Sequence, residues 1–483
     1  MFPSYETRAA PVRGMNFVPP ELEEIFRRTP ELQRAYLVGG CVRDALAGLP
    51  PAKDFDVEVF GLDYEPLLAA LARWGKTDLV GRSFGVVKLS TESGLSCDFT
   101  LPRKDSKVAP GHKGFEVEFD GAISLREAAA RRDFTINSMM YDPRQGQVLD
   151  FFGGEADWKG RILRHTSAAF GEDPLRVLRG MQFAGRFELR AAPETVELAR
   201  RMKGSYAELA VERVREEWFK WAQRSRLPSA GLRFLAETEW IGHFPEIKAL
   251  IGTAQEPEWH PEGDVFTHTC HCCDALARLP DWSEAGAESQ AVYMLAVLAH
   301  DFGKPATTHR AIKDGRERIV SPGHESAGVA PARIFLERIG APQAVALRVI
   351  PLVQNHLFHL ETISDRAVRR LARRLAPESI EGLCLVMTAD SMGRPPRAAA
   401  VPENVKTLLA RAHELEVRQK PPPPILQGRH LLPLGLAPGP ALGIILDKAY
   451  EAQLEGVFGD LQGALRWVEG EVEEEGRRMK EKG

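Results

Sequence analysis

The sequence predicts an α/β domain over residues 1–170, followed by helical regions that run to the C-terminus. Three observations predict this architecture. Between residues 35 and 151, short runs that alternate apolar and polar residues are separated by glycine-containing turns, which is typical of strands. From residue 172 onward, apolar residues recur at helical spacing instead. Two proline-containing loops, 256–264 and 418–430, interrupt the helical part and mark boundaries.

These boundaries divide the 483 residues into four regions. At about 150 residues per domain, a chain of this length is long enough for roughly three domains. The predicted regions are an α/β head (1–170), a helical neck (171–255), a helical middle domain (256–395) and a helical tail (396–483).

The composition is that of a globular protein. Hydrophobic residues make up 44% of the chain and charged residues 27%, which excludes disordered and collagen-like classes. No apolar run approaches the ~18 residues of a membrane span, and the N-terminus lacks the apolar core of a secretory signal. The six cysteines form no regular framework, so we expect a cytoplasmic protein without membrane association. The net charge of −4 neither indicates nor excludes nucleic acid, because binding depends on a local basic patch.

The first elements of the head are a strand, a glycine turn, a short helix and a second strand over residues 35–60. Gly39 and Gly40 lie between the first strand and the helix, where glycine lets the backbone approach a phosphate. Arg43 follows in the first helical turn and adds a positive charge. A hairpin is predicted next, over residues 84–101, with its turn at Glu-Ser-Gly.

Carboxylates gather on the second strand, DFDVEVF. Strict alternation places Asp54, Asp56 and Glu58 on one face of this strand. Two carboxylates at this spacing can hold a divalent cation, and hard oxygen ligands suit Mg²⁺ that is shared with substrate phosphates. Asp98, on the later alternating strand LSCDFTL, is a candidate third carboxylate. The ordinary alternative is a solvent-facing acidic strand, but the preceding glycine turn favours the metal site.

Two further segments carry candidate nucleotide contacts. Arg132 and Asp133, in AAARRDFTINSMMYDP, suit contacts with a ribose and a phosphate. In EDPLRVLRGMQF, Asp173 followed by proline fits a helix start, and Asp173, Arg176 and Arg179 share one helical face. An acceptor beside forked donors can read the edge of a base. The simpler interpretation is a capping residue with an intrahelical ion pair.

In their order and spacing, these motifs resemble the bacterial class II tRNA nucleotidyltransferases, the CCA-adding enzymes. The matching segments are LVGGCVRDAL, DFDVEVFG, RRDFTINSMMYDP, DFFGGEADW and GEDPLRVLRGMQFAGRF, within residues 35–190. The resemblance implies a polymerase-beta-like nucleotidyltransferase head, with tRNA, CTP and ATP as partners. It implies addition or repair of the 3′-terminal CCA of tRNA without a nucleic-acid template, by two-metal transfer that releases pyrophosphate.

The roles of the family's residues carry over by matching position. Asp54 and Asp56 match the catalytic Mg²⁺ ligands, and Asp98 the third carboxylate. Gln182 departs from the pattern, because many members have another arginine there. The candidate nucleotide-binding residues are Gly39, Gly40 and Arg43 at the triphosphate, Arg132 and Asp133 of the RRD motif, Glu172, Asp173 and Arg176 of the EDxxR motif that serves as template for CTP and ATP, and Arg179.

The middle domain carries a series of histidines and aspartates, each beside a helical pattern. Their order resembles HD-superfamily phosphohydrolases, which implies a second divalent metal site and hydrolysis of 2′,3′-cyclic, 2′- or 3′-phosphates at RNA ends. A relic domain used as scaffold is the alternative. The Cys-His-Cys-Cys run at 270–273 is not expected to bind zinc, because four neighbours on one helix point around its circumference. The candidate ligands are His268, His300, Asp301 and Asp390, extended by His324 and His356.

Arginines line one face of the helix predicted over residues 365–378. A solvated, salt-bridged face is the ordinary interpretation of such a pattern, and an RNA phosphate track is the functional one. Recognition of tRNA is expected to depend mainly on shape and backbone.

Three other functions remain open at this point. A CC-adding or A-adding nucleotidyltransferase shares the motifs, although the full-length stretch from Pro102 to Glu127 favours CCA or A addition. A poly(A) polymerase shares the head, but the HD-like domain argues against it. A stand-alone HD phosphohydrolase with an RNA-binding head is disfavoured by the three acidic residues of the head.

Overall fold

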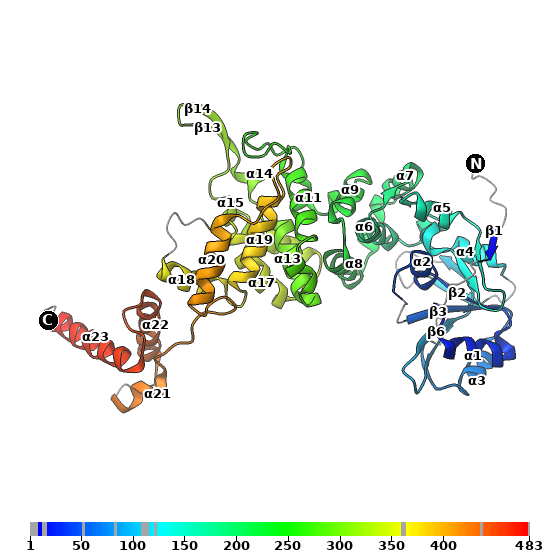
Figure 1. Cartoon of the computed structure of the whole chain (residues 1–483), viewed down its shortest axis with the longest axis horizontal. Helices are drawn as coiled ribbons and strands as arrows, with labels where there is room; N and C mark the ends of the chain where they lie inside the picture. Colours follow the sequence, from blue (N-terminus) through cyan, green and yellow to red (C-terminus); the bar gives the residue numbers. More distant parts are fainter. Residues whose placement is uncertain are drawn as a thin grey trace. The chain divides into compact units, whose positions relative to one another are not determined.

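In the computed structural model the chain folds as two compact units, Met1–His243 and Phe244–Gly483 (Figure 1). The structure describes residues 8–11, 17–50, 54–81, 85–107, 115–119, 123–358, 364–434 and 438–481. Within these residues, no helix has both the length and the apolar character needed to cross a membrane.

The first unit is built on an eight-stranded sheet with the order β1-β10-β9-β2-β3-β6-β5-β4. Neighbouring strands of this sheet run antiparallel, except β3 and β6, which are parallel. The predicted hairpin is present as β5 and β6. The strands are β1 (Arg8–Pro11), β2 (Ala35–Val38), β3 (Asp54–Val59), β4 (Lys76–Gly81), β5 (Val86–Ser90), β6 (Ser96–Thr100), β9 (Met140–Asp142) and β10 (Gln147–Asp150).

Helices cover both faces of this sheet, which confirms the predicted α/β head. On one face, Leu22 of α1 and Leu67 of α3 pack with Val57 and Phe99 of the central strands. On the other face, Ala129 of α4 packs with residues of β2 and β9. A separate pair of strands, β7 and β8, follows β6. The bounds are α1 (Pro20–Arg28), α2 (Gly40–Leu46), α3 (Tyr64–Leu71), α4 (Leu125–Ala130), β7 (Arg103–Lys107) and β8 (Phe115–Phe119).

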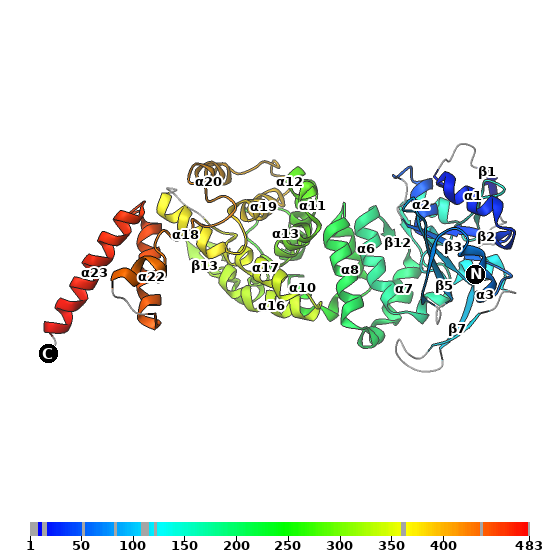
Figure 2. The same cartoon turned by 90° about the horizontal axis from the view of Figure 1, so that it is seen from below.

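Helices complete the first unit after the sheet. Figure 2 shows α6 and α8 side by side, and α9 packs on α6 as well. Helix α6 begins at Leu175 with Pro174 as its N-cap, one residue later than the sequence predicts, but Asp173 Oδ1 still accepts a hydrogen bond from the Leu175 amide at 3.0 Å. The bounds are α5 (Gly154–Lys159), α6 (Leu175–Phe187), α7 (Pro193–Arg201), α8 (Val211–Arg224) and α9 (Pro228–Glu237).

The second unit packs four helices, α11, α13, α17 and α19, around a common core. Helix α13 is central, because its residues from Ala291 to Ala299 are all buried. The helices are α10 (Pro245–Lys248), α11 (Val265–Leu276), α12 (Pro280–Glu284), α13 (Ala287–Ala299), α14 (Lys304–Thr307), α15 (His324–Ala327), α16 (Val329–Arg338), α17 (Gln343–Asn355), α18 (Asp365–Leu375), α19 (Ile380–Met392) and α20 (Glu403–Glu414).

A β-hairpin interrupts this helical unit, where the sequence analysis expected helices alone. Strands β13 (His309–Lys313) and β14 (Arg316–Val320) pair antiparallel. Asp314 and Gly315 both have positive φ, at 54° and 70°, and form the two-residue turn. An Asp-Gly pair in this conformation matches the twist of the flanking strands, so the local turn chemistry outweighs the helical trend.

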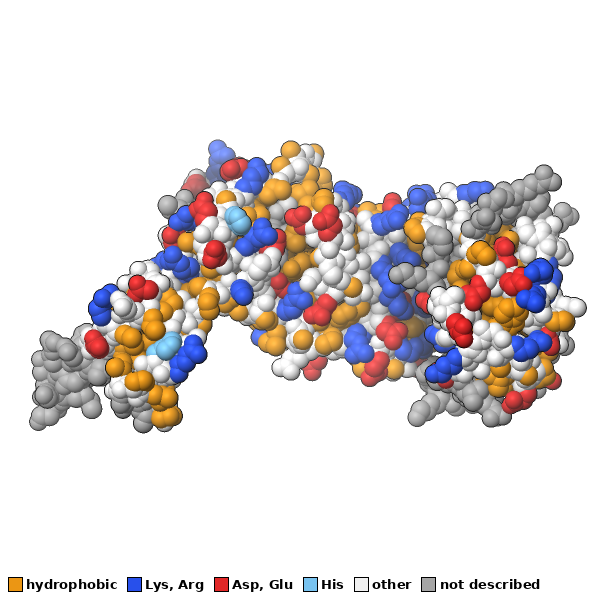
Figure 3. Space-filling model, turned by 60° about the horizontal axis from the view of Figure 1, so that its bottom comes forward, with side chains coloured by type: hydrophobic (Ala, Val, Ile, Leu, Met, Phe, Trp, Pro, Cys, Tyr) orange, Lys and Arg blue, Asp and Glu red, His pale blue; other side chains and the backbone are white. Residues whose placement is uncertain are grey.

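The last helices, α21 (Gly428–Leu431), α22 (Pro440–Glu455) and α23 (Leu461–Glu481), have an apolar cluster of their own. Hydrophobic side chains also gather on the surface of this part in Figure 3. Ile444 and Val457 are each 58% exposed. Arginines of α18 pair with α22, so the salt-bridged interpretation of the arginine face is the one that the structure shows. The pairs are Arg366 and Arg370 with Glu455 at 2.9 and 2.6 Å, and Arg373 with Glu451.

Candidate functional site

The acidic residues of the head meet on two adjacent strands. Because β3 and β6 are parallel neighbours, Asp56 lies directly opposite Asp98, and Asp54 lies opposite Ser96. Partial burial raises the pKa of Asp56, and the charges of Asp98 and Asp54 add to the rise while Arg132 opposes it. Repulsion of this kind is relieved when a cation is shared, and oxygen donors suit a hard divalent ion.

The glycine turn lies against these carboxylates. Gly39 has a φ of 73°, and a Cβ at this position would lie 3.2 Å from Arg132 Nη1 and 3.7 Å from Asp56 Oδ2. Any side chain here would therefore occupy the space between the carboxylate and the guanidinium. Gly40 then begins α2.

The arginines and Asp133 are held in defined positions. Arg43 is buried, with hydrogen bonds to Asp44 at 2.8 Å and to Asn137 at 2.5 Å. Asp133 is also buried, and it accepts hydrogen bonds from Arg179 Nε at 2.8 Å and from Asn137 at 3.0 Å. Burial opposes the ionisation of Asp133, but Arg179 and Asn137 together keep its pKa below the usual value. Asp133 therefore orients Arg179.

Hydrogen bonds also hold the side chains at the start of α6 in defined positions. Arg213 of α8 donates to Asp173 Oδ2 at 2.8 Å. The guanidinium of Arg176 donates to the carbonyls of Ala169 and Arg131 at 2.6 and 2.8 Å. These contacts hold the side chains in place because planar, forked donors are restricted once two bonds are made.

These groups line a cavity of about 490 Å³ in the first unit. Burial and the nearby cations Arg43 and Arg224 lower the pKa of Arg186, one of its lining residues, to about 10. Such a concentration of positive charge favours an anionic ligand. Of the predicted residues, the cavity is lined by Gly39, Gly40, Arg43, Asp56, Arg132, Asp133, Asp173, Arg176 and Arg179, whereas Asp54, Asp98 and Glu172 are not among its lining residues.

Several lining residues were missed by the sequence analysis. Arg213, Lys220 and Arg224 of α8 line the cavity together with Asn137 and Arg186. The signal for the first three was their spacing of seven and four residues, which places them on one helical face.

In the second unit, the structure brings all six predicted ligands of the middle domain together. We call them the histidine cluster: His268, His300, Asp301, His324, His356 and Asp390, all buried. His268 Nε2 lies 3.0 Å from Asp390 Oδ1, and Asp301 lies 3.2 Å from His300 Nε2 and 3.3 Å from His324 Nε2. They come from helices far apart in the sequence, so the fold assembles the cluster.

Each histidine of the cluster presents Nε2 to the others. The Nδ1 atoms of His300, His324 and His356 donate to the carbonyls of Val297, Ser321 and Val353 at 2.6 to 2.7 Å. A carbonyl only accepts, so Nδ1 carries the proton and Nε2 keeps its lone pair.

Histidine Nε2 atoms that keep their lone pairs are suited to bind a metal ion. Among the described residues, His300 Nε2 and His356 Nε2 are buried without a hydrogen-bond partner, whereas Asp301 Oδ2 is ion-paired with Lys304 Nζ at 2.7 Å. Burial, with His300 adding to the effect, lowers the pKa of His356 to about 3, so its ring is neutral. Ligand atoms lie within 4.8 Å of one another in three groups that could each hold an ion. The groups are His268, Cys272, His300 and Asp390; Asp301, His324 and His356; and His260, Glu262 and His268.

Two contributors to this cluster were missed by the sequence analysis. Cys272 lies one turn after His268 on α11, and its Sγ is 3.3 Å from His268 Nε2, whereas the other members of the Cys-His-Cys-Cys run do not join the groups. Glu262 accepts from the Nδ1 atoms of His268 and His260 at 2.8 and 2.9 Å. These two bonds help lower the pKa of Glu262 to about 2 against the effect of burial.

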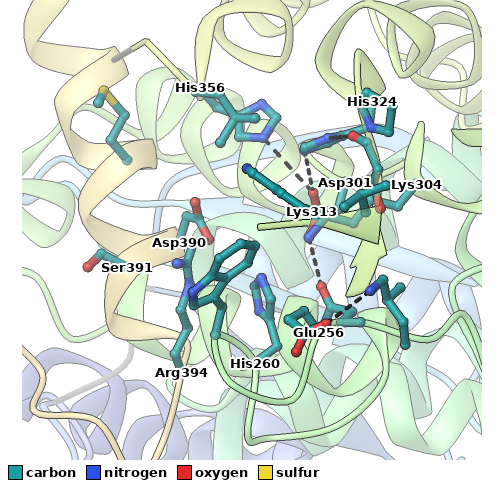
Figure 4. Close-up of a pocket in the computed structure, with 18 of the residues that line it drawn as sticks. Glu256, His260, Asp301, Lys304, Lys313, His324, His356, Asp390, Ser391 and Arg394 are labelled. Atoms are coloured by element: carbon teal, nitrogen blue, oxygen red, sulfur yellow. Dashed lines mark hydrogen bonds and ion pairs between the residues drawn. The ribbon is translucent and has the colours of Figure 1, made fainter. Parts of the chain in front are cut away.

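A cavity of about 850 Å³ opens onto the histidine cluster (Figure 4). Figure 4 shows Asp301, His324 and His356 on one side of it and Asp390 and Arg394 on another. Arg394 donates to Asp390 Oδ1 at 2.7 Å. The hairpin β13–β14 contributes part of the wall. A cavity of this size accommodates a small organic ligand.

Several known proteins are similar to this chain. The model of the Poly A polymerase head domain matches residues 35–164. The multifunctional CCA protein of Xanthomonas campestris pv. campestris (strain B100) is 38% identical over 373 residues, which cover 75% of this chain and 85% of that protein. The multifunctional CCA protein of Xanthomonas oryzae pv. oryzae (strain MAFF 311018) is 36% identical over 429 residues, 86% and 97% of the two chains.

Solved structures share the fold. The Bacillus stearothermophilus CCA-adding enzyme in complex with CTP is similar with a TM-score of 0.60 at 20% identity, over 96% of this chain and 100% of that one. The Thermotoga maritima CCA-adding enzyme complexed with tRNA gives 0.58 at 20% identity, over 95% and 97%. These matches confirm the polymerase-beta-like head and the helical body. With relatives above 30% identity over most of their length, the chain belongs to the family of the bacterial multifunctional CCA proteins, the CCA-adding tRNA nucleotidyltransferases.

Proposed function

We propose that the protein adds or repairs the 3′-terminal CCA of tRNA from CTP and ATP, with release of pyrophosphate and without a nucleic-acid template. The observation that carries this proposal is the first unit's site, where paired carboxylates and a glycine turn adjoin a cation-lined cavity. Relatives named multifunctional CCA proteins, aligned over up to 97% of their length, support it. A cytoplasmic location is the one that tRNA maturation implies.

Nucleotidyltransferases of this family use divalent metal ions. We assign the metal-holding role to Asp54 and Asp56, with Asp98 as the third catalytic carboxylate, and we propose Mg²⁺ as the ion because its preferred ligands are hard oxygens. When bound, such ions polarise the α-phosphate and neutralise charge on the leaving pyrophosphate. The Gly39–Gly40 backbone admits the triphosphate.

The same cavity supplies the nucleotide contacts. Arg43 and Arg132 offer fixed positive charge to the phosphates, which are thereby positioned for attack by the 3′-hydroxyl of the RNA. Asp173 and Arg176, with Glu172 beside them, offer an acceptor and donors to the base. Arg213 fixes Asp173 and Asp133 fixes Arg179, so the edge presented to the base is pre-organised.

Extension of a tRNA transcript that lacks its 3′ CCA tests this function. With Mg²⁺ and both nucleotides, we expect three added residues on a sequencing gel, and two residues with CTP alone. A protein that stops after two residues with both nucleotides is a CC-adding enzyme, and one that extends only a CC-ending tRNA with ATP is an A-adding enzyme. A long adenylate ladder would identify a poly(A) polymerase. Part of the stretch 102–127, which favours CCA or A addition, lies outside the described residues.

For the second unit, we propose a metal-dependent phosphohydrolase that acts on 2′,3′-cyclic, 2′- or 3′-phosphates at RNA ends. The inward Nε2 atoms of the histidine cluster support this proposal. When bound, divalent ions there activate water and polarise the phosphate. In the hydrolysis, the water oxygen bonds to phosphorus, the P–O ester bond breaks, and a proton passes to the departing ribose oxygen. Release of inorganic phosphate or opening of the cyclic ester measures it.

We also propose that the two activities belong to different regions of the chain. Nucleotide addition belongs to the head (1–170) and neck (171–255), and hydrolysis belongs to the middle domain (256–395). The tail (396–483) is a helical accessory region.

A further inference from the structure

One wall of the large cavity is made by residues outside the histidine cluster. It consists of the loop that carries Trp259 and of the hairpin β13–β14. Trp259 is 37% exposed, although most large side chains of this unit are buried. An accessible indole on the wall of a cavity that leads to a metal-competent cluster offers a flat apolar face to a ligand.

Two cations flank the indole. Arg318 Cζ lies 5.2 Å from the centre of the Trp259 ring, and Lys313 Nζ lies 5.6 Å from it. Arg318 is held by Glu258 at 2.5 Å and Glu256 at 3.6 Å. These contacts fix the position of the indole relative to the hairpin.

The loop and the hairpin form a single wall. Glu256, in the loop, also accepts a hydrogen bond from the Ile319 amide of β14 at 2.9 Å. The hairpin turn at Asp314–Gly315 then presents Lys313 at the end of β13. The wall is therefore pre-organised, which lowers the entropic cost of binding a ligand against it.

Lys313 carries a positive charge at this wall, and its ammonium lies over the Trp259 ring. Its side chain is exposed, and among the residues that the structure describes no carboxylate is paired with it. Figure 4 shows it reaching over the cavity towards the histidine cluster. An unpaired ammonium beside a metal-competent cluster favours a phosphate that is shared between the two.

We propose that Trp259 and Lys313 form a nucleotide-recognition subsite, in which a nucleobase stacks on the indole and Lys313 contacts the phosphate. The subsite makes the second unit selective for nucleotides and RNA ends over phosphate esters without a base. This inference rests on the hydrolase activity proposed above and names its specificity-determining residues. Stacking of any base on an aromatic ring is favourable, so the subsite accepts all four nucleosides.

Trp259→Ala tests the base contact in the full-length protein. The substrates are 2′,3′-cyclic AMP and the base-free ester glycerol 2-phosphate, each with Mg²⁺, Mn²⁺ or Ni²⁺. We expect kcat/KM for the nucleotide to fall about tenfold or more, because stacking contributes on this scale, and kcat/KM for glycerol 2-phosphate to stay within about twofold. Trp259→Phe keeps an aromatic face and retains most of the activity. Ile334→Ala, which truncates another exposed apolar side chain, on α16, is the control.

Lys313→Ala tests the phosphate contact separately. We expect KM to rise for both substrates, because both carry the phosphate, while kcat changes less. An equal loss on both substrates for Trp259→Ala, or no loss on either, overturns the assignment of the base contact. An unchanged KM in Lys313→Ala overturns the assignment of the phosphate contact to Lys313.

Binding provides a readout that is independent of hydrolysis. 2′-AMP is titrated against the protein and against Trp259→Phe while tryptophan fluorescence is recorded, and the difference between the two titrations reports on position 259. Saturable quenching that Trp259→Phe lacks supports the subsite, and identical titrations overturn it. If no ester is hydrolysed with any metal, the proposed hydrolase function is wrong, and the titration still decides whether the subsite binds a nucleotide.

Discussion

At the scale of single residues, the site in the head depends on three carboxylates that repel one another. Asp56 faces Asp98 across a parallel strand pair, and partial desolvation together with the charges of Asp98 and Asp54 raises its pKa against the effect of Arg132. Side chains placed in this way weaken the fold unless a cation joins them, which is a common cost of a functional site.

Asp56→Asn is expected to reduce nucleotide addition by at least about 10²–10³-fold, the scale on which loss of one charge-stabilising group lowers kcat. Asp54→Asn should act in the same way. The amide keeps the shape and removes a charge from the repelling group, so the melting temperature should stay the same or rise. Primer extension and thermal denaturation measure both effects. Asp63→Asn, an exposed aspartate of the head, should leave both unchanged.

Asp173→Asn is expected to lower kcat/KM for CTP and ATP about tenfold or more, because it replaces an acceptor by a donor at the base and weakens the bond to Arg213. Single-nucleotide incorporation with each triphosphate measures the change. The control is Glu212→Gln, which alters an exposed carboxylate next to Arg213. Unchanged incorporation of both nucleotides by Asp173→Asn would remove Asp173 from the template.

At the scale of elements, the neck is held by close contact between helices. Gly231 of α9 lies against α6, and a Cβ there would approach the Met181 carbonyl oxygen to 2.6 Å and Trp221 Nε1 to 2.8 Å. The close approach of the two helices brings α6, with its proposed nucleotide contacts, to a defined position.

Gly231→Ala is therefore expected to lower the free energy of unfolding by about 1–3 kcal/mol, the usual cost of overpacking. Denaturant titration of the variant measures this change. Gly204→Ala is the matched control, because nothing lies within 4 Å of the added Cβ. A Gly231→Ala variant as stable as the parent would contradict the close packing of α6 on α9.

At the scale of the whole molecule, each compact unit holds a cavity with its own chemistry. The cation-lined cavity belongs to Met1–His243 and the histidine cluster to Phe244–Gly483. Neither set of functional side chains draws on the other unit, so each activity should be separable by mutation.

The double variant His300→Ala, Asp301→Asn should lose phosphohydrolase activity and keep CCA addition within about twofold, because the two cavities share no lining residue and changes at sites without shared partners are additive. Parallel assays of phosphate release and tRNA extension, with a metal chelator as a common negative control, measure this. A matching loss of both activities would show that the units are functionally coupled.

The sequence by itself predicted the residue types that make up both candidate sites. Alternation along β3 places Asp54 and Asp56 on one face, and Gly39 and Gly40 between a predicted strand and a predicted helix indicate a turn that lets the backbone approach a phosphate. The histidine series could be recognised in the sequence because histidine and aspartate are residue types that bind metal ions. Local rules of this kind act over a few residues, so they can be applied without the fold.

The tertiary structure alone decided which distant residues complete these sites. Arg213 reaches Asp173 because α8 packs on α6, and Glu262 orients His268 through a loop that has no periodic pattern. The arginines of α18 form salt bridges because the fold places glutamates of α22 beside them. The placement of Trp259 followed from the hairpin that supports its loop. These contacts depend on the packing of helices, which many sequence patterns permit equally, and so they are set by the whole fold rather than by the local sequence.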